Sequence, residues 1–330
     1  MTATIKGVTL AAAVALAASA PAWAQDRSDW PANFSVGTAS QGGTFFIYGA
    51  GWANLVTEKT RVPSSTEATG GPVQNLALVQ TRDVDFGMTT MGPARDAWDG
   101  NSPIVPGVEF RNVRALFPMY QTPFQVVALQ ASGIGSIADL DGKRVGVGPR
   151  GGTCGTYWPQ FFEALGVNVN PQFGGASDLA GQVQDGLIDA FAFCAGLPIA
   201  AFAELEAQRP VNIFSFTADE QAALVEAFPV SAFEVPAGIY NSTPEPQKSV
   251  AMWNFAIGHK DLSASFVREV MATVLDNHDR MMQIHGASIE TLPENYVHNT
   301  FLWFHPGAIE YLQDNGFEID PALFPPEWQG

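Results

Sequence analysis

The chain has 330 residues, of which 16 are basic and 33 acidic, so its formal net charge at pH 7 is −17. A surface of this sign repels nucleic acid and anionic lipid head groups, because binding to either requires basic patches. The length suggests two domains. We therefore expect a two-domain protein with no nucleic-acid partner.

The first 24 residues have the three parts of a secretion signal. Lys6 gives a positive charge, Val8 to Ala20 is an apolar and alanine-rich stretch, and Ala22-Trp23-Ala24 is a small-residue cleavage site. The apolar stretch is too short to span a bilayer. We predict that residues 1–24 are a cleaved signal peptide and that the mature protein is periplasmic, in a Gram-negative cell.

The first structural unit follows directly. "NFSVG" predicts a buried strand, the glycine-rich "GTASQGGT" of residues 37–44 predicts a loop, and a helix is expected from Thr44 to about Lys59. A second helix then leads into a strand at Asp85 to Met88. The loop resembles a phosphate-binding P-loop, but Gly43 stands where the phosphate-binding lysine would be. A nucleotide site is therefore not favoured.

The second unit repeats this order. "GKRVGVG" predicts a strand, "PRGGTCGT" a glycine-rich loop, and "YWPQFFEALGV" a helix, and a further helix leads into a strand at Asp189 to Phe193. The repetition favours an α/β fold of two similar lobes. Gly146 to Gly151 also fits G-x-G-x-x-G, but a lone match in the middle of an exported chain does not indicate a dinucleotide site. No cofactor is expected.

Segments that cross between the lobes complete the organisation. "RALFPMY" and "FQVVALQ" predict strands between the two units, and residues 230–241 predict the return. Helical patterns follow at Val250 to Ala256 and at Ser263 to Met282. We therefore assign residues 25–121 plus 231–330 to lobe 1 and residues 122–230 to lobe 2.

The two glycine loops have the chemistry of an anion site. Each precedes a helix, whose first N–H groups and macrodipole attract negative charge. Thr44 and Thr153 add hydroxyl groups, and Phe45 is placed to cover a ligand. Arg150 is the one cation in either loop. It either pairs with a carboxylate or is solvated, and the sequence leaves both readings open.

Signals for enzymes are weak. The five histidines (His259, His278, His285, His298 and His305) form no H-E-x-x-H, and the chain has no G-x-S-x-G. We expect no metal site and no catalytic residue, and we expect His305 to have a structural role. Cys154 and Cys194 are able to form a disulfide in an exported protein, although spacing alone does not establish the pair. Cys154 as a nucleophile remains the enzyme alternative.

Five stretches together resemble the TAXI family of solute receptors, the extracytoplasmic components of TRAP transporters. They are "VGTASQGGTFFIYGAGWANLV", "EATGGPVQNLALVQTRDVDFGM", "IADLDGKRVGVGPRGGTCGT", "LIDAFAFCAGLP" and "HPGAIEYLQDNG". The resemblance implies a two-lobed, type-II-like periplasmic binding protein, with a mostly parallel sheet flanked by helices in each lobe. It also implies a monomer that delivers a small carboxylate, such as glutamate or 2-oxoglutarate, to the membrane components of a transporter driven by an ion gradient.

This chain departs from the family at two positions. Phe45 stands where relatives usually have tyrosine, and Gly152 stands where they usually have serine. Arg150 is a candidate to compensate for the missing hydroxyl groups. The departures leave the implied transport role intact and put the identity of the ligand in question.

These inferences give one set of candidate ligand-binding residues. They come from the two loops, from the ends of the predicted strands and from the crossing segment: Thr38, Gly43, Thr44, Phe45, Tyr48, Thr89, Thr90, Tyr120, Gln121, Arg150, Gly152, Thr153 and Phe193. Two alternatives to transport remain open, a periplasmic sensor that feeds a signalling kinase and a secreted transferase on the same fold.

Overall fold

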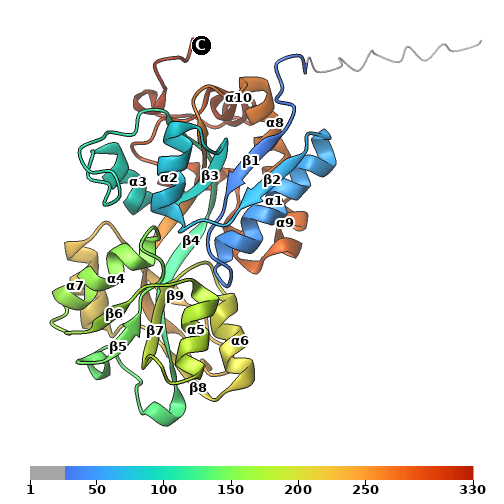
Figure 1. The fold of residues 1–330 in the computed structure, drawn as a ribbon. Helices are drawn as coiled ribbons and strands as arrows, with labels where there is room; N and C mark the ends of the chain where they lie inside the picture. The colour runs from blue at the N-terminus through green and yellow to red at the C-terminus, as the bar shows by residue number, and fades with distance from the viewer. Residues whose placement is uncertain (1–26, 330) are drawn as a thin grey trace, which may run out of the picture.

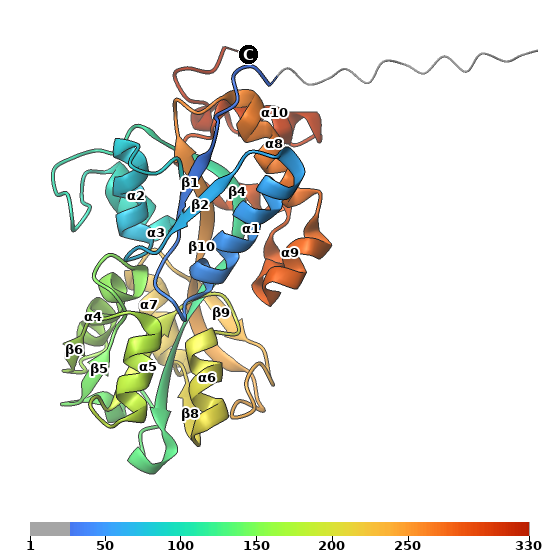
Figure 2. The same ribbon diagram turned by 45° about the vertical axis from the view of Figure 1, so that its right-hand side comes forward.

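Two long antiparallel strands, β4 (Val113–Leu129) and β10 (Gln247–His259), run through both halves of the molecule. The computed structural model describes residues 27–329, so the predicted signal peptide lies outside the described residues. β4 passes from the upper half in Figure 1 into the lower half, and Figure 2 shows β10 near it. Within the described residues, no helix has the length and apolar character needed to cross a membrane.

The upper half, lobe 1, contains the part of a ten-stranded sheet with the order β2-β1-β3-β10-β4, and the sheet continues from β4 into lobe 2. β1 is parallel to β2 and β3, whereas β10 is antiparallel to β3. Its remaining strands are β1 (Phe34–Gly37), β2 (Ser64–Glu67) and β3 (Phe86–Thr90). Its helices are α1 (Thr44–Thr60), α2 (Pro72–Thr81), α3 (Met91–Trp98), α8 (Ala264–Leu275), α9 (His278–Ile284) and α10 (Pro306–Asp314), with 3₁₀ turns η3 (Gly286–Glu290), η4 (Pro293–His298) and η5 (Pro321–Leu323).

The lower half, lobe 2, repeats the pattern. β5 is parallel to β6 and β7, and β4 is antiparallel to β7 and β8. The strands are β5 (Arg144–Gly146), β6 (Asn170–Gln172), β7 (Ala190–Cys194), β8 (Val211–Phe214) and β9 (Ser231–Val235). The helices are α4 (Thr153–Ala164), α5 (Ala176–Gln184), α6 (Ala200–Gln208) and α7 (Ala218–Ala227), with turns η1 (Gln130–Ser132) and η2 (Ala138–Leu140).

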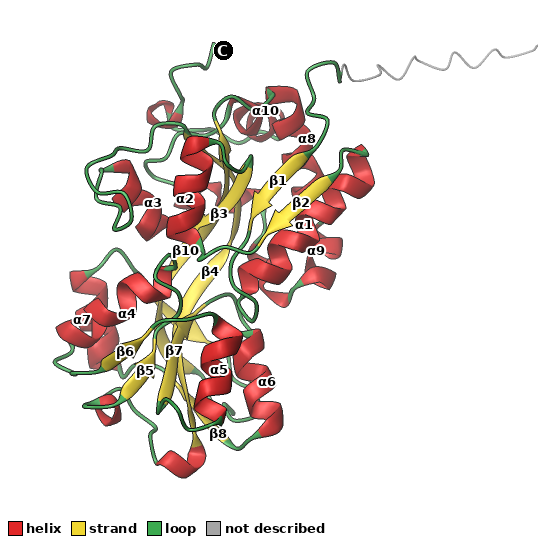
Figure 3. Ribbon diagram, viewed as in Figure 1, coloured by secondary structure: helices red, strands yellow, loops and turns green. Residues whose placement is uncertain are grey.

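Each lobe has its own hydrophobic core. One cluster of buried side chains runs from Phe34 to Tyr120 and from Phe255 to Leu323, and the other runs from Phe124 to Met252. Figure 3 shows helices on the outside of the strands in both lobes. The predicted α/β fold of two lobes with crossing segments is therefore confirmed. The sheets are mixed, because the crossing strands run antiparallel to their neighbours.

The contacts of residues 231–252 favour an end of lobe 2 that lies later in the chain than the predicted residue 230. β9 pairs with the first half of β10, and Tyr240, Val250 and Met252 belong to the second core cluster. These contacts support a proposal that the chain returns to lobe 1 near Met252. The predicted helix at Val250 to Ala256 is wrong, since these residues belong to β10. Their continuous apolar run is typical of a buried strand, which periodicity does not separate from a buried helix.

His305 joins the C-terminal segment to lobe 1. Its backbone N–H donates to the carbonyl of Ala115 in β4, and its Nδ1 accepts the N–H of Gly307 in the first turn of α10, at 3.2 Å. The side chain is 1% exposed, and this burial lowers the pKa of His305 from 6.5 to about 3. The residue has a structural role here, as a helix cap.

We predict that His305→Asn reduces the acid sensitivity of folding. In the unfolded chain the imidazole binds a proton below about pH 6.5, whereas in the folded protein it stays neutral down to about pH 3. The free energy of unfolding therefore falls as the pH drops through this window, by up to about 1.4 kcal/mol per pH unit. Asparagine retains an oxygen that caps the helix and does not titrate. Urea unfolding at pH 7, 5.5 and 4.5 measures the slope, and equal slopes in both proteins would contradict the prediction.

Candidate functional site

A pocket lies between the two lobes, where the glycine loops meet. Its cavity volume is about 40 Å³, within about 410 Å³ of unfilled space that includes open solvent. Seven predicted residues line it: Gly43, Thr44, Phe45, Thr90, Gly152, Thr153 and Phe193. It is also lined by residues that were not predicted: Ala39, Ser40, Gly70, Gly71, Pro72, Thr122, Pro149, Cys154, Cys194 and Ala195.

Helices from opposite lobes begin at this pocket. α1 starts at Thr44 after Gly43, and α4 starts at Thr153 after Gly152, with no side-chain cap on either helix. Among the described residues, the backbone N–H groups of Thr44, Thr153 and Cys154 have no hydrogen-bond acceptor. Each helix end carries a partial positive charge. The pocket thus places two positive helix ends from different lobes side by side.

Hydroxyl groups add a smaller polar contribution. The Oγ1 atoms of Thr90 and Thr153 are 2.7 Å apart across the lobes, so one of these hydroxyls donates to the other and one proton stays available. The hydroxyl of Thr44 donates to the carbonyl oxygen of Gly196 at 2.7 Å. Its proton is therefore used to join the lobes.

The remaining walls are apolar and include a disulfide. Phe45 and Phe193 are both more than nine-tenths buried. Cys154 and Cys194 are joined by a disulfide with their Cα atoms 5.5 Å apart, which is an ordinary separation. The hypothesis of a Cys154 nucleophile needs a free thiol, and the disulfide removes it.

Arg150 lies outside the pocket lining. Its side chain is exposed, and its guanidinium carbon lies 3.8 Å from the centre of the Phe173 ring. A cation over an aromatic face is a common surface contact. The arginine of the second glycine loop therefore stacks on its own lobe and does not reach the residues that line the pocket.

Five other predicted residues are also absent from the lining, for reasons that the structure makes clear. Thr38 donates to the carbonyl of Glu67, and Thr89 to that of Thr90. Side chains alternate along a strand, so Thr89 and Thr90 point to opposite faces. The other three lie on the lobe 1 side: Tyr48 bonds to Thr291, Gln121 bonds twice to Glu290, and Tyr120 packs edge-on against Phe45 and Tyr48.

Some of the unpredicted residues carry a sequence signal. Gly70 and Gly71 stand directly before Pro72, the first residue of α2, and glycine before a helix start is the same signal that marked the two recognised loops. Thr122 follows the predicted Gln121 by one position on β4. Pro149 opens the predicted glycine-rich loop "PRGGTCGT". Ala195 has no distinctive pattern around it.

The lobes are joined by reciprocal backbone hydrogen bonds next to the pocket. From lobe 1, the carbonyl of Gln41 accepts the N–H of Ser177 at the start of α5, and that of Gly42 accepts the N–H of Ala201 at the start of α6, at 3.2 and 3.1 Å. From lobe 2, the carbonyl of Gly151 accepts N–H groups of α2, including that of Val73 at 3.0 Å. Each glycine loop thus satisfies helix N-termini of the other lobe, and the lobes are closed.

Gly42 is a position where this closure depends on glycine. Its φ is +87°, and a Cβ atom would lie 2.6 Å from Oγ and 2.9 Å from the backbone nitrogen of Ser177. We predict that Gly42→Ala opens the lobes and weakens ligand binding roughly tenfold or more, as the loss of two hydrogen bonds would. Solution scattering should show a larger radius of gyration.

Gly133→Ala is the matched control for this variant. Gly133 also has a positive φ, +74°, but a Cβ atom there meets nothing within 4 Å. It therefore introduces the same backbone strain without touching the interface between the lobes. An unchanged radius of gyration in Gly42→Ala, or equal changes in the two variants, would mean that the Gly42 contact does not hold the lobes together.

The fold and the family of the chain are both defined. Two α/β lobes that are joined by crossing strands and enclose a pocket between them form a periplasmic-binding-protein fold. The chain belongs to the NMT1-like family, whose model matches residues 36–316. In the described residues, no cluster of three or more His, Cys, Asp or Glu side chains is arranged to hold a metal ion.

Solved structures with a similar fold have low sequence identity to this chain. The substrate-binding protein of an amino acid ABC transporter has 15% identity and a TM-score of 0.48, over 76% of this chain and 96% of that one. An ABC uptake transporter substrate-binding protein from Streptococcus pneumoniae with bound histidine has 13% identity and a TM-score of 0.49, over 77% of this chain and 90% of that one. The alkanesulfonate-binding protein SsuA from Xanthomonas axonopodis pv. citri bound to MOPS has 12% identity and a TM-score of 0.46, over 87% of this chain and 91% of that one.

Proposed function

We propose that the protein is a periplasmic solute receptor of the TAXI type, which captures a small organic anion and delivers it to the membrane components of a TRAP transporter. The observation that carries the proposal is the meeting of the α1 and α4 N-termini, both without side-chain caps, at one pocket between the lobes. The TAXI assignment is supported by the five stretches that resemble that family. A carboxylate is the organic anion that we favour.

The anion is bound by groups at the pocket, and the negative net charge of the whole protein has little effect on it. Thr44, Thr153 and Cys154 line the same pocket and have backbone N–H groups without an acceptor among the described residues, and the dipoles of both helices favour negative charge there. The acidic surface of the protein opposes this only weakly, because charges on exposed surfaces are screened beyond about 8 Å at physiological salt. A net charge of −17 is therefore compatible with an anionic ligand.

Capture and release follow from the crossing strands. β4 and β10 are the long strands that pass between the cores, so bending near residues 121–124 and 252–254 moves one lobe against the other. Hinge closure of two lobes around a ligand is a common transition in binding proteins. In this reading the protein carries its ligand without chemical change and acts as a monomer.

Ligand binding is tested by thermal unfolding of the mature protein with millimolar carboxylates, organic sulfonates and their neutral amides. A ligand that binds only the folded state raises Tm by mass action. We expect carboxylates to raise Tm and amides to leave it unchanged. If amides raise Tm and no anion does, the proposal of an anion receptor is wrong. Uptake of the identified ligand by vesicles that contain the TRAP membrane components tests delivery.

We predict that Gly43→Asp abolishes binding of the anion. A Cβ atom at Gly43 has its nearest contacts at 3.4 and 3.6 Å, and φ is −93°, so a side chain fits there without strain. Aspartate at this position caps α1 with its own carboxylate and thereby occupies the N–H groups of that helix. We expect affinity for the carboxylate to fall at least a hundredfold, measured by isothermal titration calorimetry.

Gly43→Ala is the control. It adds the same Cβ atom but no charge and no acceptor, so we expect its affinity to stay within about threefold of the original protein. Both variants should fold, and aspartate at the N-cap is expected to stabilise α1 by about 1 kcal/mol relative to alanine. Full binding of the carboxylate by Gly43→Asp would show that the α1 N-terminus is not the anion site.

A further inference from the structure

We infer that the ligand is a short monocarboxylate, with one negative charge, no ammonium group and an apolar remainder. This inference rests on the proposed function and narrows it. It departs from the glutamate and 2-oxoglutarate implied by the family resemblance, and the reason is the chemistry of the residues that line the pocket.

The pocket lining offers no carboxylate to pair with an ammonium group. In the part of the chain that the structure describes, no Asp or Glu is among the residues that line the pocket. A buried ammonium needs an anionic partner or several carbonyl acceptors. The helices α1 and α4 instead present their positive ends, which repel a cation. An α-amino acid therefore brings a charge that this pocket disfavours.

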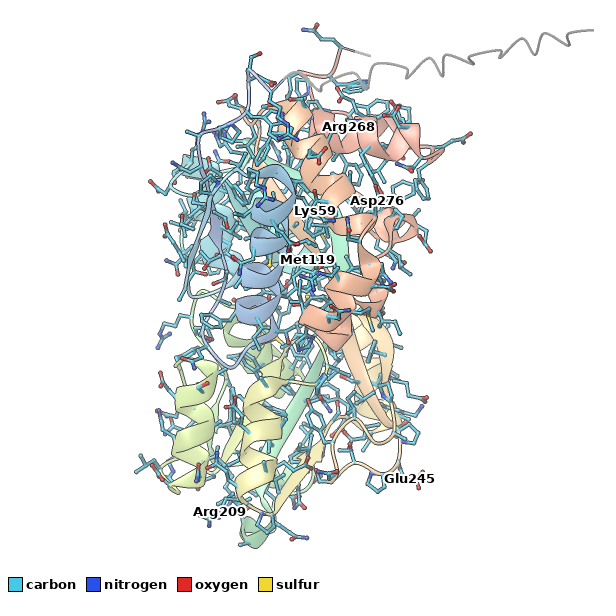
Figure 4. All side chains as sticks on the ribbon, turned by 90° about the vertical axis from the view of Figure 1, so that its right-hand side faces the viewer. Lys59, Met119, Arg209, Glu245, Arg268 and Asp276 are labelled. Carbon is cyan, nitrogen blue, oxygen red and sulfur yellow. A yellow bond between two sulfur atoms is a disulfide. The ribbon has the colours of Figure 1, made fainter. Side chains whose placement is uncertain are left out.

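The nearby ionisable groups are engaged elsewhere. Arg150 stacks on Phe173, Asp96 accepts a hydrogen bond from the Tyr157 hydroxyl, and Glu290 binds Gln121. Figure 4 shows Arg209 and Glu245 at the far end of lobe 2, away from lobe 1. Among the described residues, no Lys, Arg or His lines the pocket either, so a second carboxylate would have no counter-ion.

The charge of the site matches one carboxylate. Each helix N-terminus is equivalent to about half an elementary charge, so the two ends of α1 and α4 together offset about one negative charge. The Thr90–Thr153 hydroxyl pair supplies one further proton to the same group. A dianion would leave its second charge buried against apolar walls.

The apolar walls and the small volume of the pocket favour a short, apolar group attached to the carboxylate. Aromatic and aliphatic groups surround the helix ends: Ala39, Phe45, Pro72, Pro149, Phe193 and Ala195. The space that a water centre can reach, about 40 Å³, holds only a few water molecules. A chain of about two to five carbon atoms matches this small volume.

Matched ligand pairs test the inference on the mature protein by isothermal titration calorimetry. A series from acetate to pentanoate sets the best chain length. At four carbons, butanoate is then compared with 2-aminobutanoate, which adds an ammonium group, with succinate, which adds a carboxylate, and with butanamide, which removes the charge. We expect a monocarboxylate of the series to bind, and each of the three butanoate analogues to bind at least tenfold more weakly than butanoate.

The outcomes distinguish a failure of the monocarboxylate inference from a failure of the proposed anion receptor. If succinate or 2-aminobutanoate binds more tightly than every monocarboxylate, the narrower inference is wrong and the anion receptor stands. If no monocarboxylate binds at millimolar concentration, the narrower inference also fails. If butanamide binds as tightly as butanoate, the charge has no role, and the proposed function fails with the inference.

Discussion

The N–H groups at helix N-termini are the constraint around which this molecule is arranged. The first turn of every helix has N–H donors with no partner inside the helix, and a buried donor needs an acceptor. At α2, α5 and α6 the acceptors are carbonyl groups of the opposite lobe, from Gly151, Gln41 and Gly42. At α1 and α4 the residues that carry these donors line the pocket. Closure and ligand binding thus use the same kind of group at neighbouring positions.

Side-chain caps are found on helices that do not contribute to the pocket lining. The helices α7, α8 and α10, none of which contributes to the pocket lining, begin at Thr217, Ser263 and His305, and each of these side chains accepts a backbone N–H. The helices α1 and α4 have glycine at this position and no side-chain cap. A capping residue stabilises a helix by about 1 kcal/mol, so glycine here gives up local stability and leaves the donors available to another group.

The sequence predicted local features of the site better than its long-range contacts. Glycine before a helix start is a local pattern, and it led to Gly43, Thr44, Gly152 and Thr153, all of which line the pocket. The partner of Tyr48 is 243 residues away, at Thr291, and no local pattern indicates that pairing. For the same reason the sequence left the disulfide open, since only the fold brings β7 beside the start of α4. The class of each lobe was predictable because alternation of strands and helices is itself local.

Closure of the lobes creates an electrostatic repulsion that a bound anion removes. Bringing the lobes together places the positive ends of α1 and α4 near each other in a pocket with mostly apolar walls, where like charges repel more strongly than at the surface. The hydrogen bonds from Gln41, Gly42 and Gly151 favour closure, and this repulsion opposes it. An anion between the two ends replaces the repulsion by two attractions, one to each lobe. The anionic ligand that we propose would therefore act as the counter-ion of closure, and a cation or a neutral molecule of the same size would lack that effect.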